Sequence, residues 1–325
     1  MGFNVYVTRV IPEPGLAVLR KECETTDVNP DDRVLTREEL LSEVKGRDGV
    51  LCLLTDKIDA EVFDAASGAK IFANYAVGYD NIDVPAATER GIAITNTPGV
   101  LTDATSDMAW SLLFTIARRT AESDKYTRAG KFKGWGPMLF LGGDITDRTL
   151  GIIGAGRIGT AFARKSVGFR MKVLYSDVRE NKELEKEVGA KKVDLDTLLK
   201  EADYISVHVP LMPETTHLIG KREFGLMKKS AYLINTSRGP VVDEKALVEA
   251  LKSGEIAGAG LDVYEKEPEV EPGLFKLDNI VLAPHLGSAT IETRTKMATM
   301  AAGNLVAMLK GEEPPNIVNP EVLKK

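Results

Sequence analysis

The sequence predicts an α/β protein of two domains, each a parallel sheet with helices on both faces. Apolar runs of strand length alternate with amphipathic helical stretches along most of the 325 residues, which is the pattern of repeated strand-helix-strand units. The length alone corresponds to about two domains at roughly 150 residues each. Both sheets are therefore expected to be doubly wound, of the Rossmann-like or flavodoxin-like kind.

The composition is that of a globular protein with an acidic balance. Hydrophobic residues make up 43% of the chain and charged residues 28%, which are ordinary proportions. The formal net charge of −6 disfavours a general binder of nucleic acid or of anionic membranes, because both need a basic surface. Cys23 and Cys52 are too few for a disulfide framework or a cysteine-rich metal site, so no metal is expected. No stretch has the length of a membrane span, and we expect a cytoplasmic protein without a membrane partner.

The first domain is expected to begin with four strand-helix alternations. Thr36 and Glu39 form a capping box, in which the glutamate reaches back to the threonine backbone and starts a helix. The expected strands are 3–8, 49–54, 70–76 and 92–96, and the expected helices are 15–22, 36–44, 60–66 and 84–90.

A long helix and an unusual apolar segment follow. The helix is expected from about Thr102 to Arg128, with apolar side chains at helical spacing on one side. Residues 130–147 then mix glycine with large apolar side chains, Trp135 among them. Because this is uncommon in a solvated loop, we expect the segment to pack on another subunit.

A second alternating series begins at residue 149 and is expected to form the six strands of a dinucleotide-binding sheet. Only this series carries a glycine fingerprint. The chain therefore divides into a first domain, 1–100 plus 289–325, and a cofactor domain, 101–288. The final helix, 290–309, is expected to return to the first domain. The six strands are 149–153, 171–177, 204–209, 231–236, 258–263 and 280–283.

A G-x-G-x-x-G motif occupies residues 154–159, directly after a strand and at the head of a helix. Gly154 permits the tight turn, Gly156 lets the backbone approach a pyrophosphate, and Gly159 lets helix and strand pack closely. Amides at the helix N-terminus then favour the pyrophosphate charge. Motif and context together predict a dinucleotide site.

Asp177 indicates which dinucleotide binds. It stands eighteen residues beyond Gly159, at the end of the next strand, where a carboxylate can accept hydrogen bonds from the adenosine ribose. Because this carboxylate would repel a 2′-phosphate, NAD(H) is the expected cofactor. Arg179 leaves room for some use of NADP(H), since its guanidinium can pair with that phosphate if Asp177 turns aside.

Hydride transfer from such a cofactor to a carbonyl needs a proton donor, and histidine is the usual one at neutral pH. Of the three histidines, His285 is the strongest candidate, because it follows the last strand, where the two domains should face each other across a cleft. His208 is expected to pack on the cofactor side. His217 is expected to be structural.

Two further charged groups lie on loops after neighbouring strands. Arg238 can project toward a ligand carboxylate as a planar, two-pronged donor. An acidic group in the loop 264–268 can hold and charge-stabilise the imidazolium of His285. Spacing alone does not choose between Glu265 and Glu267.

Four motifs now stand in a fixed order, at residues 154–159, 235–239, 262–268 and 284–288. With them the chain resembles, from end to end, the D-isomer-specific 2-hydroxyacid dehydrogenases, most closely the glyoxylate/hydroxypyruvate reductase branch. The resemblance implies reduction of small 2-oxo acids by NADH, with glyoxylate and hydroxypyruvate as first candidates. Reductases similar to this one often carry a basic group where Asp177 stands, and on this point we follow the charge argument.

The resemblance also implies roles for individual residues. Arg238 would anchor the substrate and act electrostatically, Glu267 would be the partner of the histidine, and His285 would donate the proton. The backbone of residues 76–81 would bind the substrate carboxylate, with Leu53 nearby.

The resulting site has three sets of residues. The catalytic set is Arg238, Glu267 and His285. The substrate set is Leu53, Val77, Gly78, Arg238 and His285. The cofactor set is Gly154, Gly156, Arg157, Ile158, Gly159, Asp177, Thr105, Val209, Pro210, Thr236, Asp262 and Gly287.

The expected partner besides the substrate is a second copy of the chain. Trp135 matches a position that reaches a neighbouring active site in similar reductases, so a homodimer with an arm at about 102–147 is expected. Two alternatives to the leading function stay open. One is a short D-3-phosphoglycerate dehydrogenase, because the shared catalytic residues do not discriminate a phosphorylated side group. The other is an NAD-sensing corepressor-like binding module, which the acidic, tail-free chain disfavours.

Overall fold

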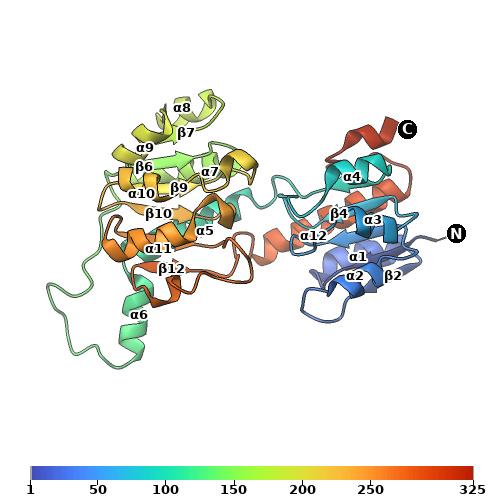
Figure 1. Cartoon of the computed structure of the whole chain (residues 1–325), viewed down its shortest axis with the longest axis horizontal. Helices are drawn as coiled ribbons and strands as arrows, with labels where there is room; N and C mark the ends of the chain where they lie inside the picture. The colour runs from blue at the N-terminus through green and yellow to red at the C-terminus, as the bar shows by residue number, and fades with distance from the viewer. Residues whose placement is uncertain (1, 325) are drawn as a thin grey trace. The chain divides into compact units, whose positions relative to one another are not determined.

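The computed structural model of this chain describes residues 2–324. The chain divides into two compact units: unit 1 comprises Met1–Leu101 and Ala289–Lys325, and unit 2 comprises Thr102–Ser288. Each unit contains one parallel sheet with helices packed on it (Figure 1). The predicted fold class, an α/β protein with two parallel sheets, is therefore confirmed.

Unit 1 contains a five-stranded sheet in the order β2-β1-β3-β4-β5, which is the flavodoxin-like order. Ligands bind at the carboxyl ends of strands in such sheets, so the loops after β3 and β4 are the ones that matter for a site. The strands are β1 (Asn4–Val7), β2 (Thr25–Val28), β3 (Gly49–Cys52), β4 (Ile71–Asn74) and β5 (Ala93–Thr95).

Two helical layers cover this sheet. One contains α1 and α12, which pack on each other, and α12 also contacts β3, β4 and β5. The other contains α2, α3 and α4, over a core in which Phe63 meets Phe72 edge to face. The predicted capping box is present, because the Thr36 N–H donates to Glu39 Oε2 at 2.7 Å and the Glu39 N–H donates to Thr36 Oγ1 at 3.2 Å. The helices are α1 (Glu13–Glu22), α2 (Arg37–Glu43), α3 (Ala60–Ala65), α4 (Val84–Glu89) and α12 (Ile291–Leu309).

Unit 2 contains a seven-stranded sheet in the order β12-β11-β10-β9-β6-β7-β8. From β8 to β11 this is the Rossmann order, with β12 added at one edge. The strands are β6 (Thr149–Ile153), β7 (Lys172–Ser176), β8 (Lys191–Lys192), β9 (Tyr204–Val207), β10 (Tyr232–Asn235), β11 (Gly258–Leu261) and β12 (Ile280–Leu282).

Each face of this sheet has its own apolar core. Side chains of α5, α7 and α8 share one core with the sheet, and side chains of α9, α10 and α11 share the other. The helices of unit 2 are α5 (Thr102–Ala117), α6 (Thr120–Arg128), α7 (Arg157–Lys165), α8 (Lys182–Val188), α9 (Leu195–Glu201), α10 (Lys221–Leu226) and α11 (Glu244–Ser253).

Three expected elements need correction. The edge strand β2 of unit 1 and the edge strand β8 of unit 2 were not predicted. Because of β8, unit 2 has seven strands where six were expected. The single helix predicted from Thr102 to Arg128 is wrong, because the chain breaks into α5 and α6 at Arg119, where φ is +53°. Arg119 is held in this conformation by a two-fold hydrogen bond to Glu122 and lies over the ring of Phe140, 5.1 Å from its centroid.

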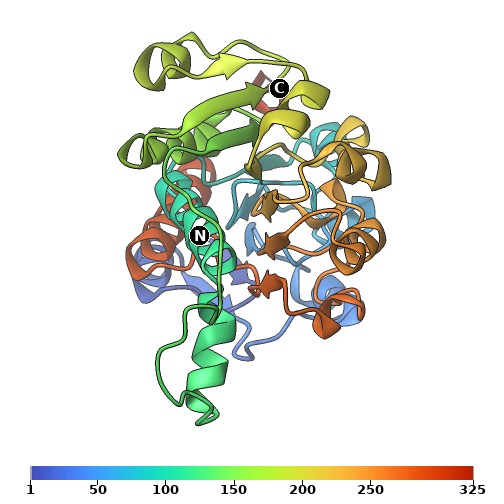
Figure 2. The same cartoon turned by 90° about the vertical axis from the view of Figure 1, so that its left-hand side faces the viewer.

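The segment after α6 extends from the body of unit 2. In both views α6 and the loop that follows it project away from the sheet of this unit (Figures 1 and 2). Apolar side chains are exposed along the loop, with Trp135 86% and Met138 76% exposed. From here on, the name arm is used for α6 and residues 129–147 only.

Among residues 2–324, no helix is both long enough and apolar enough to cross a membrane. The same residues contain no group of three or more histidine, cysteine, aspartate or glutamate side chains placed to hold a metal ion.

Candidate functional site

The glycine loop joins β6 to α7 and has one open side. Gly154 has φ +93°, a left-handed conformation that favours glycine. A Cβ atom on Gly159 would lie 2.0 Å from the carbonyl oxygen of Gly154, so helix and strand pack too closely for any side chain there. A Cβ atom on Gly156 would meet nothing within 4 Å. The loop is thus tight on its inner side and accessible at Gly156, which fits the approach of a pyrophosphate.

Asp177 follows β7 directly, and its carboxylate is fixed against the glycine loop. Oδ2 accepts a hydrogen bond from the Ala155 N–H at 2.8 Å, and Oδ1 accepts one from the Arg179 N–H at 2.9 Å. Turning aside would break both bonds. The arrangement therefore keeps a negative charge beside the loop that is predicted to bind the dinucleotide.

The end of β9 packs on the same loop. A Cβ atom on Gly154 would lie 2.8 Å from the His208 carbonyl carbon and 2.9 Å from Val209 Cγ1. Burial lowers the pKa of His208 to about 3, so its ring is neutral at pH 7, and its Nε2 lies 2.9 Å from Ser206 Oγ. His208 is therefore a packing group beside the cofactor loop and a poor proton donor. Pro210, two residues further, is exposed.

Buried polar atoms without a protein partner gather where the strands of unit 2 end. Within residues 2–324, Thr236 Oγ1 and Asp262 Oδ2 are buried and have no hydrogen-bond partner. A Cβ atom on Gly287 would lie 3.3 Å from Asp262 Oδ2 and 3.5 Å from Thr105 Oγ1, so these predicted cofactor residues meet although they come from different elements. An unsatisfied buried acceptor is costly. A ligand that donates hydrogen bonds, as a carboxamide does, fits this position.

His285 and Glu267 form a hydrogen-bonded pair after β12. His285 Nδ1 lies 2.8 Å from Glu267 Oε2, and the other carboxylate oxygen accepts from the Tyr264 N–H at 3.1 Å. Both side chains are about 30% exposed, so the pair is held by the protein and still accessible. The backbone of His285 has φ +57° and is fixed through its N–H, which donates to the Asp262 carbonyl oxygen at 2.9 Å.

The charge of this pair is set by its neighbours. Burial raises the pKa of the Glu267 carboxyl, but the hydrogen bond and charge of His285 and the Tyr264 N–H outweigh burial, with a further contribution from the Arg238 guanidinium. The pKa of Glu267 therefore lies below its ordinary value. Glu267 is therefore an anion at neutral pH, and its Oε2 lies 2.8 Å from His285 Nδ1.

The structure also separates the two glutamates that the spacing did not distinguish. Glu267 contacts His285, whereas Glu265 contacts His217, with 3.1 Å between Glu265 Oε2 and His217 Nε2. The other oxygen of Glu265 accepts from the backbone N–H of Glu244 at 2.8 Å. His217 is thus part of a separate contact, in agreement with its structural interpretation.

Arg238 lies on a turn fixed by the side chain of Asn235, the last residue of β10. Asn235 Nδ2 donates to the Arg238 carbonyl oxygen at 2.9 Å, and its Oδ1 accepts from the Ser237 N–H and hydroxyl. The next residue, Gly239, touches the loop that carries Glu267, because a Cβ atom there would lie 1.8 Å from the carbonyl carbon of Tyr264. The positions of Arg238 and of the Glu267 loop are therefore coupled.

The predicted substrate loop lies in unit 1, after β4, with Leu53 after β3 in the same unit. Three consecutive carbonyl oxygens of this loop are tied by hydrogen bonds of 2.8 Å each. The bonds run from the Thr97 N–H to Ala76, from Asn96 Nδ2 to Val77, and from Asn74 Nδ2 to Gly78.

Carbonyl and N–H point in opposite directions in a trans peptide. The N–H groups of Val77, Gly78 and Tyr79 therefore face away from these anchors, and successive N–H groups of this kind suit an anion. Sequence reasoning missed the role of Asn74 and Asn96. Their only signal is an amide side chain at or just after a strand end.

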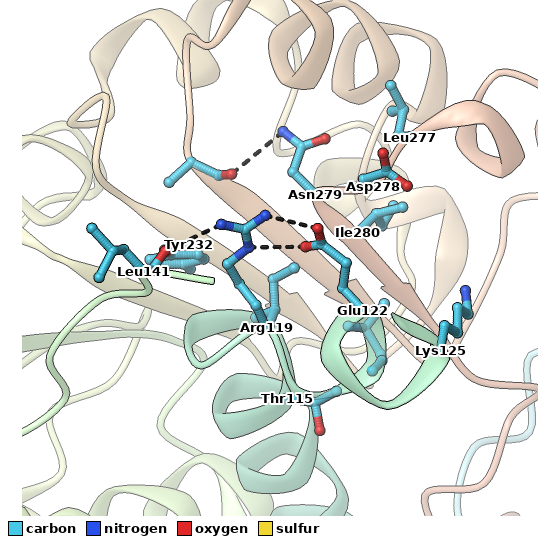
Figure 3. Close-up of a pocket in the computed structure, with 14 residues that line it drawn as sticks. Thr115, Arg119, Glu122, Lys125, Leu141, Tyr232, Leu277, Asp278, Asn279 and Ile280 are labelled. Carbon is cyan, nitrogen blue, oxygen red and sulfur yellow. Dashed lines mark hydrogen bonds and ion pairs between the residues drawn. The ribbon is translucent and has the colours of Figure 1, made fainter. Parts of the chain in front are cut away.

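A hollow of about 310 Å³ lies elsewhere in unit 2, beside α5, α6 and β12 (Figure 3). Arg119 and Glu122 face each other there, joined by hydrogen bonds of 2.8 and 2.7 Å. None of the predicted site residues lines it. The hollow belongs to the base of the arm and is separate from the carboxyl ends of the strands.

The glycine loop, the fixed acidic residue after β7 and the Rossmann strand order define an NAD-binding protein. The family model described as D-isomer specific 2-hydroxyacid dehydrogenase, NAD binding domain, matches residues 110–287. The chain is 53% identical over 324 residues to the glyoxylate reductase of Thermococcus litoralis, covering 98% of each chain. It is 54% identical over 323 residues to that of Korarchaeum cryptofilum, covering 99% of this chain and 97% of the relative.

Solved structures agree. The glyoxylate reductase from Paecilomyes thermophila matches with a TM-score of 0.87 at 34% identity, covering 98% of each chain. An NADPH-dependent glyoxylate/hydroxypyruvate reductase from Sinorhizobium meliloti, in complex with NADP and malonate, matches with a TM-score of 0.86 at 31% identity, covering 99% of this chain and 98% of that one. The chain belongs to the D-isomer specific 2-hydroxyacid dehydrogenase family, and the resemblance read from the four motifs is confirmed.

Proposed function

We propose that this chain reduces glyoxylate and hydroxypyruvate to their 2-hydroxy acids with NADH, and that His285 donates the proton. The observation that carries the proposal is the 2.8 Å contact between His285 Nδ1 and Glu267 Oε2. The names of the relatives, glyoxylate reductases about half identical over nearly the whole chain, support the substrate class.

The proposed mechanism assigns one task to each charged residue. NADH supplies the hydride when it is bound. Glu267 occupies Nδ1 of His285, which leaves Nε2 as the atom that gives its proton to the substrate oxygen. The carboxylate of Glu267 stabilises the imidazolium before the transfer. Arg238 would anchor the substrate and stabilise the charge that develops on its oxygen. In the oxidative direction His285 accepts the proton.

The reaction would draw on both units. The N–H groups of Val77 and Gly78 in unit 1, whose peptides are oriented by the Thr97 N–H and by Asn96 Nδ2, would bind the substrate carboxylate, with Leu53 nearby. Unit 1 would thus be the substrate-binding domain, which the sequence places at 1–100 plus 289–325, and unit 2 would be the cofactor domain, which the sequence places at 101–288.

NADH is the proposed cofactor in preference to NADPH. Residues of the glycine loop, 154–159, would hold the pyrophosphate, and Thr105, Thr236 and Asp262 would face the nicotinamide end, where two of them have unpartnered oxygens within residues 2–324. The two backbone bonds that fix Asp177 support the exclusion of a 2′-phosphate. The Sinorhizobium relative is NADPH-dependent, and the test below therefore compares the two cofactors directly.

The proposal includes a homodimer in the cytoplasm. The exposed apolar side chains of the arm, Trp135 foremost, support a contact with a second copy and, by the family resemblance, a position near its active site. Cys23 and Cys52 are both free thiols, which is the ordinary state in a reducing compartment.

The test is oxidation of NADH, and separately of NADPH, by the purified protein with glyoxylate, hydroxypyruvate, pyruvate and 3-phosphohydroxypyruvate. Fast turnover of the first two with NADH is expected, with at least a tenfold lower kcat/KM for NADPH. D177A should reduce the ratio of kcat/KM for NADH to kcat/KM for NADPH. The matched control E180Q removes a carboxylate three residues further along the chain and should leave this ratio unchanged. If 3-phosphohydroxypyruvate is reduced faster than glyoxylate and hydroxypyruvate, the alternative function, a short D-3-phosphoglycerate dehydrogenase, replaces the proposed one. NADH binding without turnover of any acid would favour the corepressor-like module.

A further inference from the structure

The loop that carries Glu267 is tied at both ends to one buried carboxylate. Glu244, the first residue of α11, is only 4% exposed. Its Oε1 accepts from the Glu265 N–H at 2.9 Å, and its Oε2 accepts from the Glu271 N–H at 3.2 Å. A single side chain therefore closes the segment 265–271 into a loop.

Glu244 and Glu265 are joined by two hydrogen bonds that run in opposite directions. The Glu244 N–H donates to Glu265 Oε1 at 2.8 Å, while Glu265 Oε2 contacts His217 at 3.1 Å. Between the two tied ends, the Glu269 N–H donates to the Lys266 carbonyl oxygen at 2.8 Å and forms a tight turn. Glu267 is the second residue of that turn. The position of its side chain is therefore set by the turn and by the two hydrogen bonds that Glu244 accepts at the ends of the loop.

We infer that Glu244 is a positioning residue that holds Glu267 against His285 by tying both ends of the loop 265–271. The inference rests on the proposed function, because it assumes that the Glu267–His285 pair does the proton chemistry. It goes beyond that function in assigning a role to a residue that lies outside the catalytic, substrate and cofactor sets.

A carboxylate is the side chain that this position requires. The two N–H groups need two acceptor oxygens, and a carboxylate offers both whereas an amide offers one oxygen and one NH₂ group. Burial raises the pKa of Glu244, and the two backbone N–H groups oppose that shift. Its place in the first turn of α11 also favours a negative charge. The cost of burying an acid is thus offset by contacts that serve only to hold the loop.

The central experiment is E244Q in the full-length enzyme, assayed with NADH and glyoxylate from pH 5 to 9. The amide keeps the size of the side chain but turns an NH₂ group toward one backbone N–H. We expect kcat to fall about tenfold or more, the KM for NADH to stay within twofold, and the fall of kcat with rising pH to begin at a lower pH. E249Q, on the exposed side of the same helix, is the control and should match the parent enzyme.

A double-variant cycle shows whether Glu244 acts through Glu267. E244Q should cost little further activity in an E267Q background, because the pair that it positions is already broken. Equal losses in both backgrounds, or a parent-like kcat and pH profile for a folded E244Q enzyme, would overturn the inference. If the E267Q enzyme keeps the kcat and pH profile of the parent, the Glu267–His285 pair does not do the proton chemistry. That outcome overturns the proposed mechanism and is distinct from a failure of the inference about Glu244.

A second variant covers the case in which E244Q does not fold. E265A removes only the reciprocal bond and the contact with His217, and its side chain is 23% exposed. We expect a smaller loss of kcat with the same direction of change in the pH profile. An E265A enzyme with parent-like kcat and pH profile would then count against the inference.

Discussion

At the scale of single residues, His285 has a backbone conformation with positive φ, and its ring is held by the contact with Glu267. A positive φ is uncommon for a residue with a side chain, although histidine tolerates it better than most, and such conformations concentrate at functional sites. Here the N–H of His285 and the N–H of Leu286 both donate to Asp262, to its carbonyl oxygen and to its Oδ1. The backbone contacts of Asp262 therefore hold His285 in place while one oxygen of its carboxylate stays free of protein partners within residues 2–324.

The Glu267 carboxylate yields a prediction with a definite sign. Its pKa lies below the ordinary value, so it is charged throughout pH 5 to 9 and supports the protonated donor over that range. Reduction should slow as pH rises, because the donor loses its proton. In E267Q this fall should begin at a lower pH, and kcat at pH 7 should drop about 10²-fold.

The measurement for E267Q is kcat for glyoxylate across pH 5 to 9. E269Q is the matched control, two residues along the same exposed turn, and its profile should follow that of the parent enzyme. His208 should contribute nothing in this range, because its pKa is about 3. An E267Q enzyme with a parent-like kcat and an unmoved profile would remove Glu267 from the mechanism.

The sequence predicted these residues unequally. The fingerprint at 154–159 and Asp177 could be found because each has a fixed place relative to a strand. The choice between Glu265 and Glu267 could not be made from spacing, since both lie on one loop and the deciding contacts come from His217 and His285, 48 and 18 residues away. Glu244 gave no signal at all, because an acid in the first turn of a helix is ordinary.

At the scale of secondary structure, prediction succeeded for strands and helices with a clear apolar pattern. It failed for two edge strands without an apolar run and for one helix that side-chain contacts interrupt. β8 is two lysines, Lys191–Lys192, and β2 alternates between exposed and half-buried residues without a buried position. Neither carries an apolar run. The break between α5 and α6 arises from contacts of Arg119 with Glu122 and Phe140, and helical periodicity does not record such contacts.

The arm is the element that calls for a second copy of the chain. α6 has nine residues and none of them is buried, yet an isolated helix of that length is marginal in water. The loop after it exposes Trp135 and Met138. A partner that covers both would supply the missing burial. We therefore expect W135S/M138S to shift the protein from dimer to monomer by at least tenfold in dissociation constant.

Light scattering after size exclusion, over a range of protein concentrations, measures this shift. F275S is the control, because Phe275 is also exposed, at 66%, but lies outside the arm. A parent protein that is monomeric at all concentrations would contradict the prediction. A dimer unaffected by W135S/M138S would place the interface elsewhere.

At the scale of the whole molecule, the division of labour between the units follows from where each residue set lies. Unit 2 is one continuous segment, Thr102–Ser288, with apolar cores on both faces of its sheet. It contains the glycine loop, Asp177, Arg238 and the Glu267–His285 pair. Unit 1 contains the backbone N–H groups proposed for the substrate carboxylate, and its two chain segments are joined through α1 and α12.

This arrangement predicts that residues 102–288, expressed alone, fold cooperatively and bind NADH but do not turn over glyoxylate. Binding should persist within about threefold in Kd, because the cofactor set lies wholly inside the fragment. Turnover should vanish, because positioning the substrate is worth several powers of ten in rate and the proposed carboxylate site is missing. Thermal melting, NADH fluorescence titration and the glyoxylate assay are the three measurements. A fragment that reduces glyoxylate at the rate of the full chain would show that Arg238 and unit 2 suffice to hold the substrate, and the anion site at residues 77–79 would then need another role.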